Sequence, residues 1–296
     1  MSAVFRRFFT SALVAAAVIG TPAGPAFAIA DGEDAAHGAY RFSVLLTMTG
    51  LPTDGGGTRN SSCSGALVAP RWVITAGHCF RTADGRYVSR LVAARTIATI
   101  GRADLNAADG HEVDVVAVRQ AKNADVALAE LGAPVTDITP LRVGATPPAV
   151  GETVRLTGYG LTSDAESAAT RRLQTGQFVV DRVGDSMLET SGRAPSRETS
   201  PCRHDSGGPY FTERPGDAPV LVAVVSSGPG CPHTGDDLGA RTDNLSGWIN
   251  DTIHERAAGS SDRRLGSVGL AVLVAALLAA SLAALALRRP PTPASS

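Results

Sequence analysis

Short runs of apolar and β-branched residues, separated by Gly, Pro, Asp and Asn, recur through the middle of the chain, from residue 29 to residue 256. Runs of this length and composition are typical of strands in antiparallel sheets and barrels. The pattern changes within residues 244–257, where Leu245, Trp248 and Ile249 have the spacing of one helix face. We therefore expect an all-β domain that ends in one helix. The expected strands are residues 43–48, 65–69, 72–76, 96–101, 112–120, 125–131, 153–160, 176–183 and 220–228.

The N-terminal segment has the layout of a secretory signal peptide. Arg6 and Arg7 precede an apolar run, residues 8–20, and a Pro/Gly stretch then leads to Ala-Phe-Ala at residues 26–28. Basic, apolar and small-x-small segments in this order predict a signal peptide over residues 1–28. The alternative is a membrane anchor, but the apolar run is short and a cleavage signal follows it.

The C-terminal segment has a different hydrophobic pattern. Residues 268–287 contain no charged side chain. A helix of this length spans about 30 Å, the thickness of the hydrocarbon core of a bilayer. We expect a transmembrane helix here, preceded by a linker at residues 257–267 and followed by a cytoplasmic tail at residues 288–296, because export of the middle leaves the tail inside. A buried helix is the alternative, but the Ala, Leu and Val residues leave no polar face.

Charge and cysteine content narrow the class of protein. The formal net charge is −1, so nothing indicates a nucleic-acid partner. Four cysteines occur in the exported part, and an even number there favours two disulfides. Metal binding is the alternative, although the chain has no Cys-x-x-Cys pair, and spacing alone leaves three pairings open. The cysteines are Cys63, Cys79, Cys202 and Cys231.

Three short motifs carry side chains that together suit nucleophilic catalysis. "TAGHC" contains His78, "DVALAEL" contains Asp125 and "DSGGP" contains Ser206. A serine hydroxyl is a poor nucleophile at neutral pH, so it needs a general base such as His78. A buried Asp125 would hold the imidazole in the right tautomer and stabilise its charged form.

This order of His, Asp and Ser in an exported all-β chain resembles the chymotrypsin/trypsin-like serine proteases, from Ile29 to about Arg256. The resemblance implies two six-stranded antiparallel β-barrels with the active site between them. It also implies an oxyanion hole made by the backbone N–H groups of His204 and Ser206. The family usually has glycine at the position of His204. A side chain there favours a flipped 203–204 peptide or crowds the leaving-group side, and we expect it to point to solvent.

The resemblance assigns further positions. It pairs Cys63 with Cys79 and Cys202 with Cys231. Substrate-binding positions follow by register: Ser200 at the floor of the specificity pocket, Ser226 near Asp125, Gly228 in the pocket wall, and Asp237, or Asp236, at its back. A carboxylate at the back favours Arg or Lys as P1, the residue before the cleaved bond. The alternative is that Asp237 lies outside the pocket, where it pairs with Arg241 or faces solvent. In that case the serine at the pocket floor favours a neutral or aromatic P1 residue.

The resemblance also implies an ion pair that forms when such proteases are activated. In the family, cleavage frees an Ile or Val α-amino group that pairs with the aspartate before the nucleophile, here Asp205. "IADG" resembles the family's mature start, so Ile29 is the expected new N-terminus. The signal cleavage site ends at Ala28, so we expect export itself to release the activating amine.

The leading prediction is a serine endopeptidase that works through an acyl-enzyme and is tethered to the outer face of the cell membrane. A catalytically weakened pseudoprotease that serves as a binding module, and an esterase, are the alternatives on the same fold. We expect protein or peptide substrates, a monomer, and no cofactor. We also expect no metal, because the loop that binds calcium in some relatives is abbreviated.

Overall fold

The computed structural model describes residues 29–165 and 171–255. The predicted signal peptide (1–28), linker (257–267), transmembrane helix (268–287) and tail (288–296) lie outside these described residues. Within the described residues, none of the helices has the length and apolar character needed to cross a bilayer.

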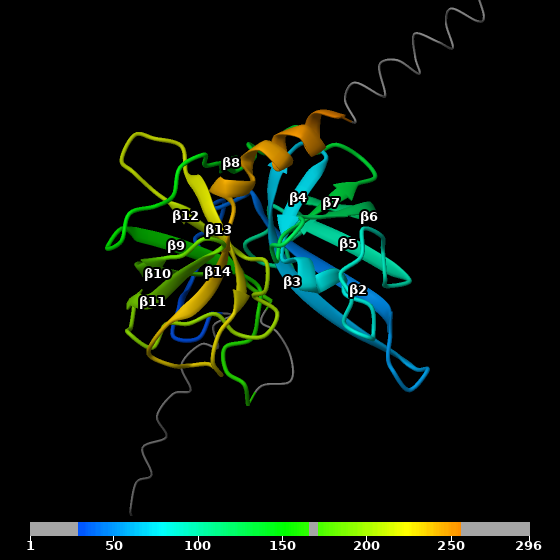
Figure 1. Cartoon of the computed structure of the whole chain (residues 1–296), viewed down its shortest axis with the longest axis horizontal. Coiled ribbons are helices and arrows are strands. Elements are labelled where there is room, and N and C mark those ends of the chain that lie inside the picture. Colours follow the sequence, from blue (N-terminus) through cyan, green and yellow to red (C-terminus); the bar gives the residue numbers. More distant parts are fainter. Residues whose placement is uncertain (1–28, 166–170, 256–296) are drawn as a thin grey trace, which may run out of the picture.

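The first half of the domain is a closed antiparallel barrel (Figure 1). Its strands pair in the order β2-β3-β4-β7-β6-β5. Between β4 and β5 the chain forms a short 3₁₀ helix, η1 (Gly77–Phe80). The strand bounds are β2 (Ser43–Pro52), β3 (Thr58–Ala69), β4 (Trp72–Thr75), β5 (Arg95–Ile100), β6 (His111–Gln120) and β7 (Ala127–Leu131).

The second half contains another six-stranded ring. Its strands pair in the order β9-β10-β11-β14-β13-β12, and β12 pairs back to β9. Two short strands extend this ring: β1 (Glu33–Asp34) along β10, and β8 (Arg142–Val143) parallel to β13. The strand bounds are β9 (Thr153–Gly158), β10 (Gln174–Val183), β11 (Met187–Ala194), β12 (Pro209–Thr212), β13 (Val220–Ser227) and β14 (Asp237–Arg241).

The chain ends in the expected helical segment. A 3₁₀ turn, η2 (Asp243–Leu245), leads into a helix over residues 246–255. Ile249 on this helix is fully buried, in a core cluster that contains the buried side chains of the first barrel and several of the second, although the helix follows the second barrel in the chain (Figure 1). The prediction of two six-stranded barrels with a C-terminal helix is therefore confirmed.

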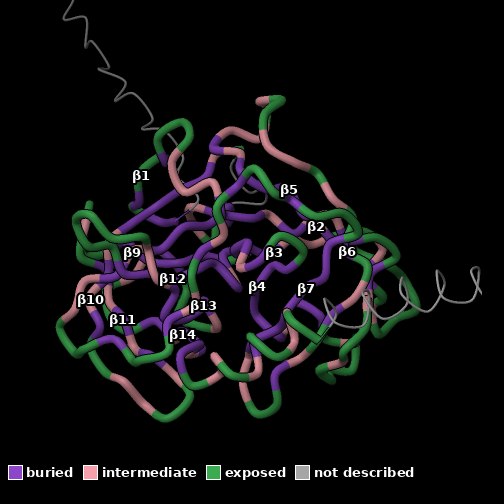
Figure 2. Tube along the Cα trace, turned by 90° about the horizontal axis from the view of Figure 1, so that it is seen from above, coloured by how far each residue is buried: buried purple, intermediate pink, exposed green. Residues whose placement is uncertain are grey.

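The apolar runs form strands because alternate side chains fill the barrels. Leu46 and Leu128 in the first barrel and Val154 and Phe178 in the second are at most 1% exposed. Buried strand segments fill the interior, while exposed segments lie mostly in the connecting loops (Figure 2).

The sequence pattern did not predict β11, β12 and β14. In β11 the inward positions are Leu188, Thr190 and Gly192, so only one is a large apolar side chain. β12 and β14 are only four and five residues long. Pairing with neighbouring strands stabilises these segments, and a hydrophobic pattern does not record that contribution.

The two barrels meet at a tight junction around Gly207. Its N–H donates to the carbonyl of Val225 at 2.8 Å, and its φ is +82°. A Cβ at this position would lie 2.0 Å from Oγ1 of Thr75 in β4 and 2.5 Å from the backbone nitrogen of Ala76. The loop after Ser206 therefore packs directly on the first barrel, and only glycine leaves room for the contact.

Replacing Gly207 by alanine should lower the free energy of unfolding by more than the strain of a positive φ alone. Gly216 is the matched control, because its φ is +85° but a Cβ there would contact nothing within 4 Å. We expect Gly216→Ala to lower the free energy of unfolding by about 1 kcal/mol from left-handed strain. Gly207→Ala should lower it by about 3 kcal/mol or more, because overpacking adds to that strain. Denaturant titration of both variants measures the difference, and equal losses would contradict the packing argument.

Candidate active site

His78 and Asp125 meet at the edge of the first barrel. His78 lies on η1, directly after β4, and Asp125 lies just before β7. The His78 backbone N–H donates to Asp125 Oδ1 at 2.7 Å, and Nδ1 of the ring lies 2.7 Å from Oδ2. The Ser226 hydroxyl, from β13 of the other barrel, also donates to Oδ2 at 2.7 Å.

These contacts set the charge of Asp125. Its side chain is 14% exposed, and burial acts to raise its pKa. The hydrogen bonds from His78 and Ser226 outweigh burial, so the pKa of Asp125 is lowered overall and the group is ionised at neutral pH. A carboxylate only accepts, so Nδ1 of His78 carries a proton and Nε2 is the basic nitrogen of the neutral ring.

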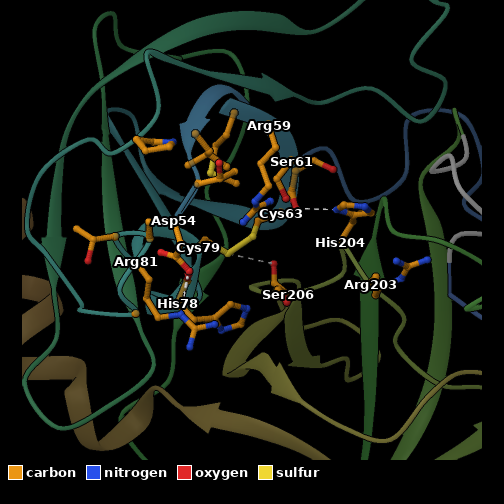
Figure 3. A pocket seen from close by; sticks show the side chains of 18 residues that line it. Asp54, Arg59, Ser61, Cys63, His78, Cys79, Arg81, Arg203, His204 and Ser206 are labelled. Atoms are coloured by element: carbon orange, nitrogen blue, oxygen red, sulfur yellow. Dashed lines mark hydrogen bonds between the residues drawn. A yellow bond between two sulfur atoms is a disulfide. The ribbon is translucent and has the colours of Figure 1, made fainter. Parts of the chain in front are cut away.

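Ser206 lies on the loop between the second disulfide and β12, and lines one cavity with His78 (Figure 3). The volume of this cavity is about 800 Å³. The Ser206 carbonyl accepts the N–H of Ser64 in β3 at 2.9 Å, which ties the loop to the first barrel. Within residues 29–165 and 171–255, the Ser206 hydroxyl and the His78 ring share no direct hydrogen bond. Such bonds are often loose before substrate binds.

Two backbone N–H groups on this loop are free to bind an anion. Asp205, Gly207 and Gly208 donate to the carbonyls of Cys202, Val225 and Asp205, respectively. His204 and Ser206 have no acceptor for their N–H groups in the described part of the chain. The carbonyl of Arg203 accepts the N–H of Leu161 at 2.9 Å, so the N–H on the other side of that trans peptide points away from Leu161.

The side chain of His204 does not point to solvent, contrary to our expectation. The ring is half-buried, and its Nδ1 lies 3.0 Å from the carbonyl oxygen of Ser62 on β3. The backbone has φ of +78°, in the left-handed region. An open acceptor on the neighbouring strand explains the difference, and the sequence gives no sign of it.

Two disulfides border the loop, with the pairing that the resemblance implies. Cys63 on β3 is joined to Cys79 on η1, next to His78. Cys202 is joined to Cys231. The second disulfide lines a smaller cavity of about 160 Å³ on the other side of Ser206. Ser226 and Gly228 line this smaller cavity as well.

Ser200 does not line the smaller cavity. It is fully buried beside the N-terminal segment, where it exchanges two backbone hydrogen bonds with Ala30. Its hydroxyl donates to the Glu198 carbonyl and accepts the N–H of His233. The register assignment of Ser200 to the pocket floor therefore receives no support from the cavity lining.

Asp237, the first residue of β14, lies directly behind the wall of the smaller cavity. It is 1% exposed, and a Cβ on Gly228 would lie 2.3 Å from Asp237 Oδ1. Arg241 pairs with Asp243 instead, so neither alternative for Asp237, pairing with Arg241 or facing solvent, fits. Burial, with smaller contributions from the charges of Asp236 and Asp205, raises the pKa of Asp237 to about 8. Asp236 itself is exposed.

His233 is the residue at this site that the sequence analysis missed. Its Nε2 lies 3.3 Å from Asp237 Oδ1, within ion-pair distance. The two groups lack hydrogen-bond alignment, and in the described chain both ring nitrogens and both carboxylate oxygens are buried without a hydrogen-bond partner. A histidine four residues before a buried aspartate was the available signal. Buried polar atoms without a partner are rare in native proteins and require an explanation, such as a bound water, ion or ligand.

Ile29 and Asp205 both lie in the interior of the second barrel region. Ile29 and Asp205 are fully buried. The Asp205 carboxylate accepts the N–H groups of Gly160 and Cys202 at 2.8 and 2.9 Å. Burial raises its pKa well above the ordinary value despite these bonds. No cationic side chain pairs with it in the described residues.

Comparison with known proteins places this geometry in a family. Residues 29–249 match the family model described as Trypsin. The chain is 28% identical to "Serine protease 56" of Mus musculus, over 79% of this chain and 40% of the mouse protein. It is 28% identical to "Transmembrane protease serine 9" of Rattus norvegicus, over 79% of this chain and 22% of the rat protein.

A bacterial relative matches over more of its own length. The chain is 29% identical to a "Trypsin-like protease" of Streptomyces glaucescens, over 69% of this chain and 74% of that protein. The chain thus spans less than half of the two mammalian relatives and about three quarters of the bacterial one. Because the family model matches most of the chain, this protein belongs to the trypsin family.

Proposed function

We propose that this chain is a serine endopeptidase that cleaves peptide bonds through an acyl-enzyme, with His78, Asp125 and Ser206 as its catalytic triad. The observation that carries the proposal is the cavity between the barrels. Ser206 and a histidine already oriented by an ionised aspartate line this one cavity, and two free backbone N–H groups lie on the Ser206 loop.

In the proposed reaction, the Ser206 oxygen attacks the substrate carbonyl while His78 Nε2 takes the hydroxyl proton. The N–H groups of His204 and Ser206 donate to the oxyanion, and each such donor is worth about 2.7–4 kcal/mol. His78 then gives its proton to the leaving amine, and the acyl-Ser206 ester remains. Water repeats the same steps to release the acid and restore Ser206. Asp125 stabilises the charged ring throughout, held by Ser226.

We propose Asp237 as the determinant of P1 preference. The smaller cavity beside Ser206 is the one that a P1 side chain would enter, and the Asp237 carboxylate lies behind its wall at Gly228. Aligned donors for this carboxylate are absent from the described residues, and the one Arg, Lys or His nitrogen found within 4 Å of it there is Nε2 of His233. A guanidinium or ammonium of P1 Arg or Lys would provide the missing donors, since buried carboxylates are stable when paired.

We further propose an exported, membrane-tethered protein whose mature N-terminus is Ile29. The two disulfides fit an oxidising compartment. The tether depends on the apolar sequence of residues 268–287 and the export signal on residues 1–28. Asp205 supports activation at Ile29, because a fully buried carboxylate with no cationic side chain is suited to an α-ammonium group.

Removal of the nucleophile tests the proposed function. Ser206→Ala should lower kcat by about 10⁴-fold or more, and His78→Ala should lower it by nearly as much. The double variant should have a kcat only slightly below that of either single variant, because triad members act as a unit. Ser186→Ala, on an exposed turn of the second barrel, is the control.

A fluorophosphonate probe and paired amide and ester substrates separate the alternative functions. Labelling that is lost in Ser206→Ala and kept in Ser186→Ala supports an enzyme. An unlabelled wild-type protein would indicate a pseudoprotease, and turnover of esters without peptides would indicate an esterase.

The P1 proposal predicts a pH dependence with a definite sign. Asp237 attracts a cation only after it loses its proton, so kcat/KM for an Arg substrate relative to a Phe substrate should rise as pH increases from 7 to 9. Taking the ratio cancels pH effects on the catalytic groups that both substrates need. Asp237→Gly should abolish the rise and lower the ratio about tenfold or more, whereas Asp236→Asn should preserve the preference for Arg. A preference for Arg that persists in Asp237→Gly would remove Asp237 from the pocket.

Activation at Ile29 is testable on the protein extracted from membranes. N-terminal sequencing should give Ile29 as the first residue. An uncleavable extension before Ile29 should lower kcat/KM roughly a hundredfold or more, because Asp205 then stays buried without its cation. An active preparation with another N-terminus, or full activity with the extension, would refute this route.

A further inference from the structure

The backbone of His204 adopts a conformation that usually requires glycine. Its φ of +78° is the most positive among the non-glycine residues that the structure describes. For a residue with a Cβ, this left-handed region costs on the order of 1–2 kcal/mol. Such strain persists only where surrounding contacts hold it.

Strand β3 supplies those contacts from the opposite barrel. The Ser62 carbonyl lies 3.0 Å from His204 Nδ1, and the Ser64 hydroxyl donates to the His204 carbonyl at 3.1 Å. The Ser64 N–H donates to the carbonyl of Ser206 at 2.9 Å. The first two bonds hold the side chain and the carbonyl of His204, and the third holds the nucleophile two residues later.

The chemistry of the first bond fixes the state of the ring. A carbonyl oxygen only accepts, so Nδ1 of His204 must carry a proton. Both the neutral Nδ1–H tautomer and the protonated ring satisfy this condition, so the bond does not depend on the charge of the ring. His204 is therefore unsuited to be a second general base through Nδ1, since this nitrogen has no free lone pair.

The strand that accepts this bond also positions the general base. Ser62 directly precedes Cys63, whose disulfide to Cys79 is adjacent to His78. The ring of His204 thus connects the loop of the two free N–H groups to the segment that carries His78 (Figure 3).

We propose that His204 is a positioning residue, whose side chain is tethered to the Ser62 carbonyl and thereby holds the His204 N–H in the orientation that the oxyanion requires. The proposal rests on the proposed function for its catalytic consequence, but not for the tether itself. The tether stabilises a positive φ at a residue that has a Cβ, whereas glycine adopts this conformation without such support.

Two substitutions at this position separate a tether from crowding of the leaving-group side. His204→Ala keeps the Cβ strain and loses the tether, so the loop should relax to negative φ and turn the N–H away. We expect kcat to fall at least tenfold. This is less than the 10²–10³-fold fall in kcat that follows complete loss of an oxyanion-hole donor. His204→Gly also loses the tether but has no Cβ strain, so its kcat should exceed that of His204→Ala at least threefold. KM should change less than kcat in both variants.

A peptide aldehyde sharpens the kinetic test, because its adduct with Ser206 places an oxyanion in the same position. Its affinity should fall in His204→Ala in proportion to kcat/KM. His37→Ala, an exposed histidine outside the cavity, is the matched control, and thermal unfolding shows whether each variant is folded. If His204→Ala is as fast as wild type or faster than His204→Gly, the tether inference is wrong. A kcat above that of wild type in both variants would show instead that the ring crowds the cleft.

The tautomer of the ring provides a readout that does not require activity. Long-range ¹⁵N–¹H spectra of the histidine-labelled full chain, in the Ser206→Ala background to prevent self-digestion, distinguish the two neutral forms. Nδ1–H at His204 supports the tether, and Nε2–H overturns it. If wild type shows no Ser206-dependent hydrolysis but His204 is Nδ1–H, the proposed function fails and the tether stands.

Discussion

The hydrogen bond from the Ser64 N–H to the Ser206 carbonyl is the contact on which the site depends. The candidate nucleophile and the candidate base come from different barrels, so no single sheet fixes their separation. Ser64 is 1% exposed, and its neighbours Cys63 and Gly65 lie within β3. Strand β3 therefore holds a loop of the second barrel in a fixed position against the first barrel. The close packing of Gly207 on Thr75 holds the next residue in the same way.

Three buried carboxylates surround this junction, and their hydrogen-bond donors distinguish their roles. Asp125 accepts three hydrogen bonds from His78 and Ser226, and its pKa is lowered. Asp205 accepts two from backbone N–H groups, and burial raises its pKa. Asp237 has no aligned donor within the described chain, and its pKa is raised to about 8. Burial acts to raise the pKa of all three, so the donors decide whether each pKa is lowered or raised overall.

The sequence predicted the features that strong local signals encode. β-branched runs located nine strands, and short motifs carried His78, Asp125, Ser206 and the cysteines. Strand β11 was missed because its inward positions include Thr190 and Gly192, and its stability comes from pairing with β10 and β14. The direction of the His204 side chain depends on a carbonyl 142 residues away in the chain. No local pattern records such a partner. The contact between His233 and Asp237, by contrast, joins residues only four apart, so the sequence did carry a signal for it.

The C-terminal helix, residues 246–255, affects the order in which the protein can fold. Ile249 belongs to the core cluster that contains the buried side chains of the first barrel, whose last strand, β7, ends at Leu131, and several of the second. This part of the core therefore needs a side chain that is synthesised more than a hundred residues after the end of β7. A chain cut before this helix would therefore keep every strand of both rings and still leave the buried site of Ile249 empty.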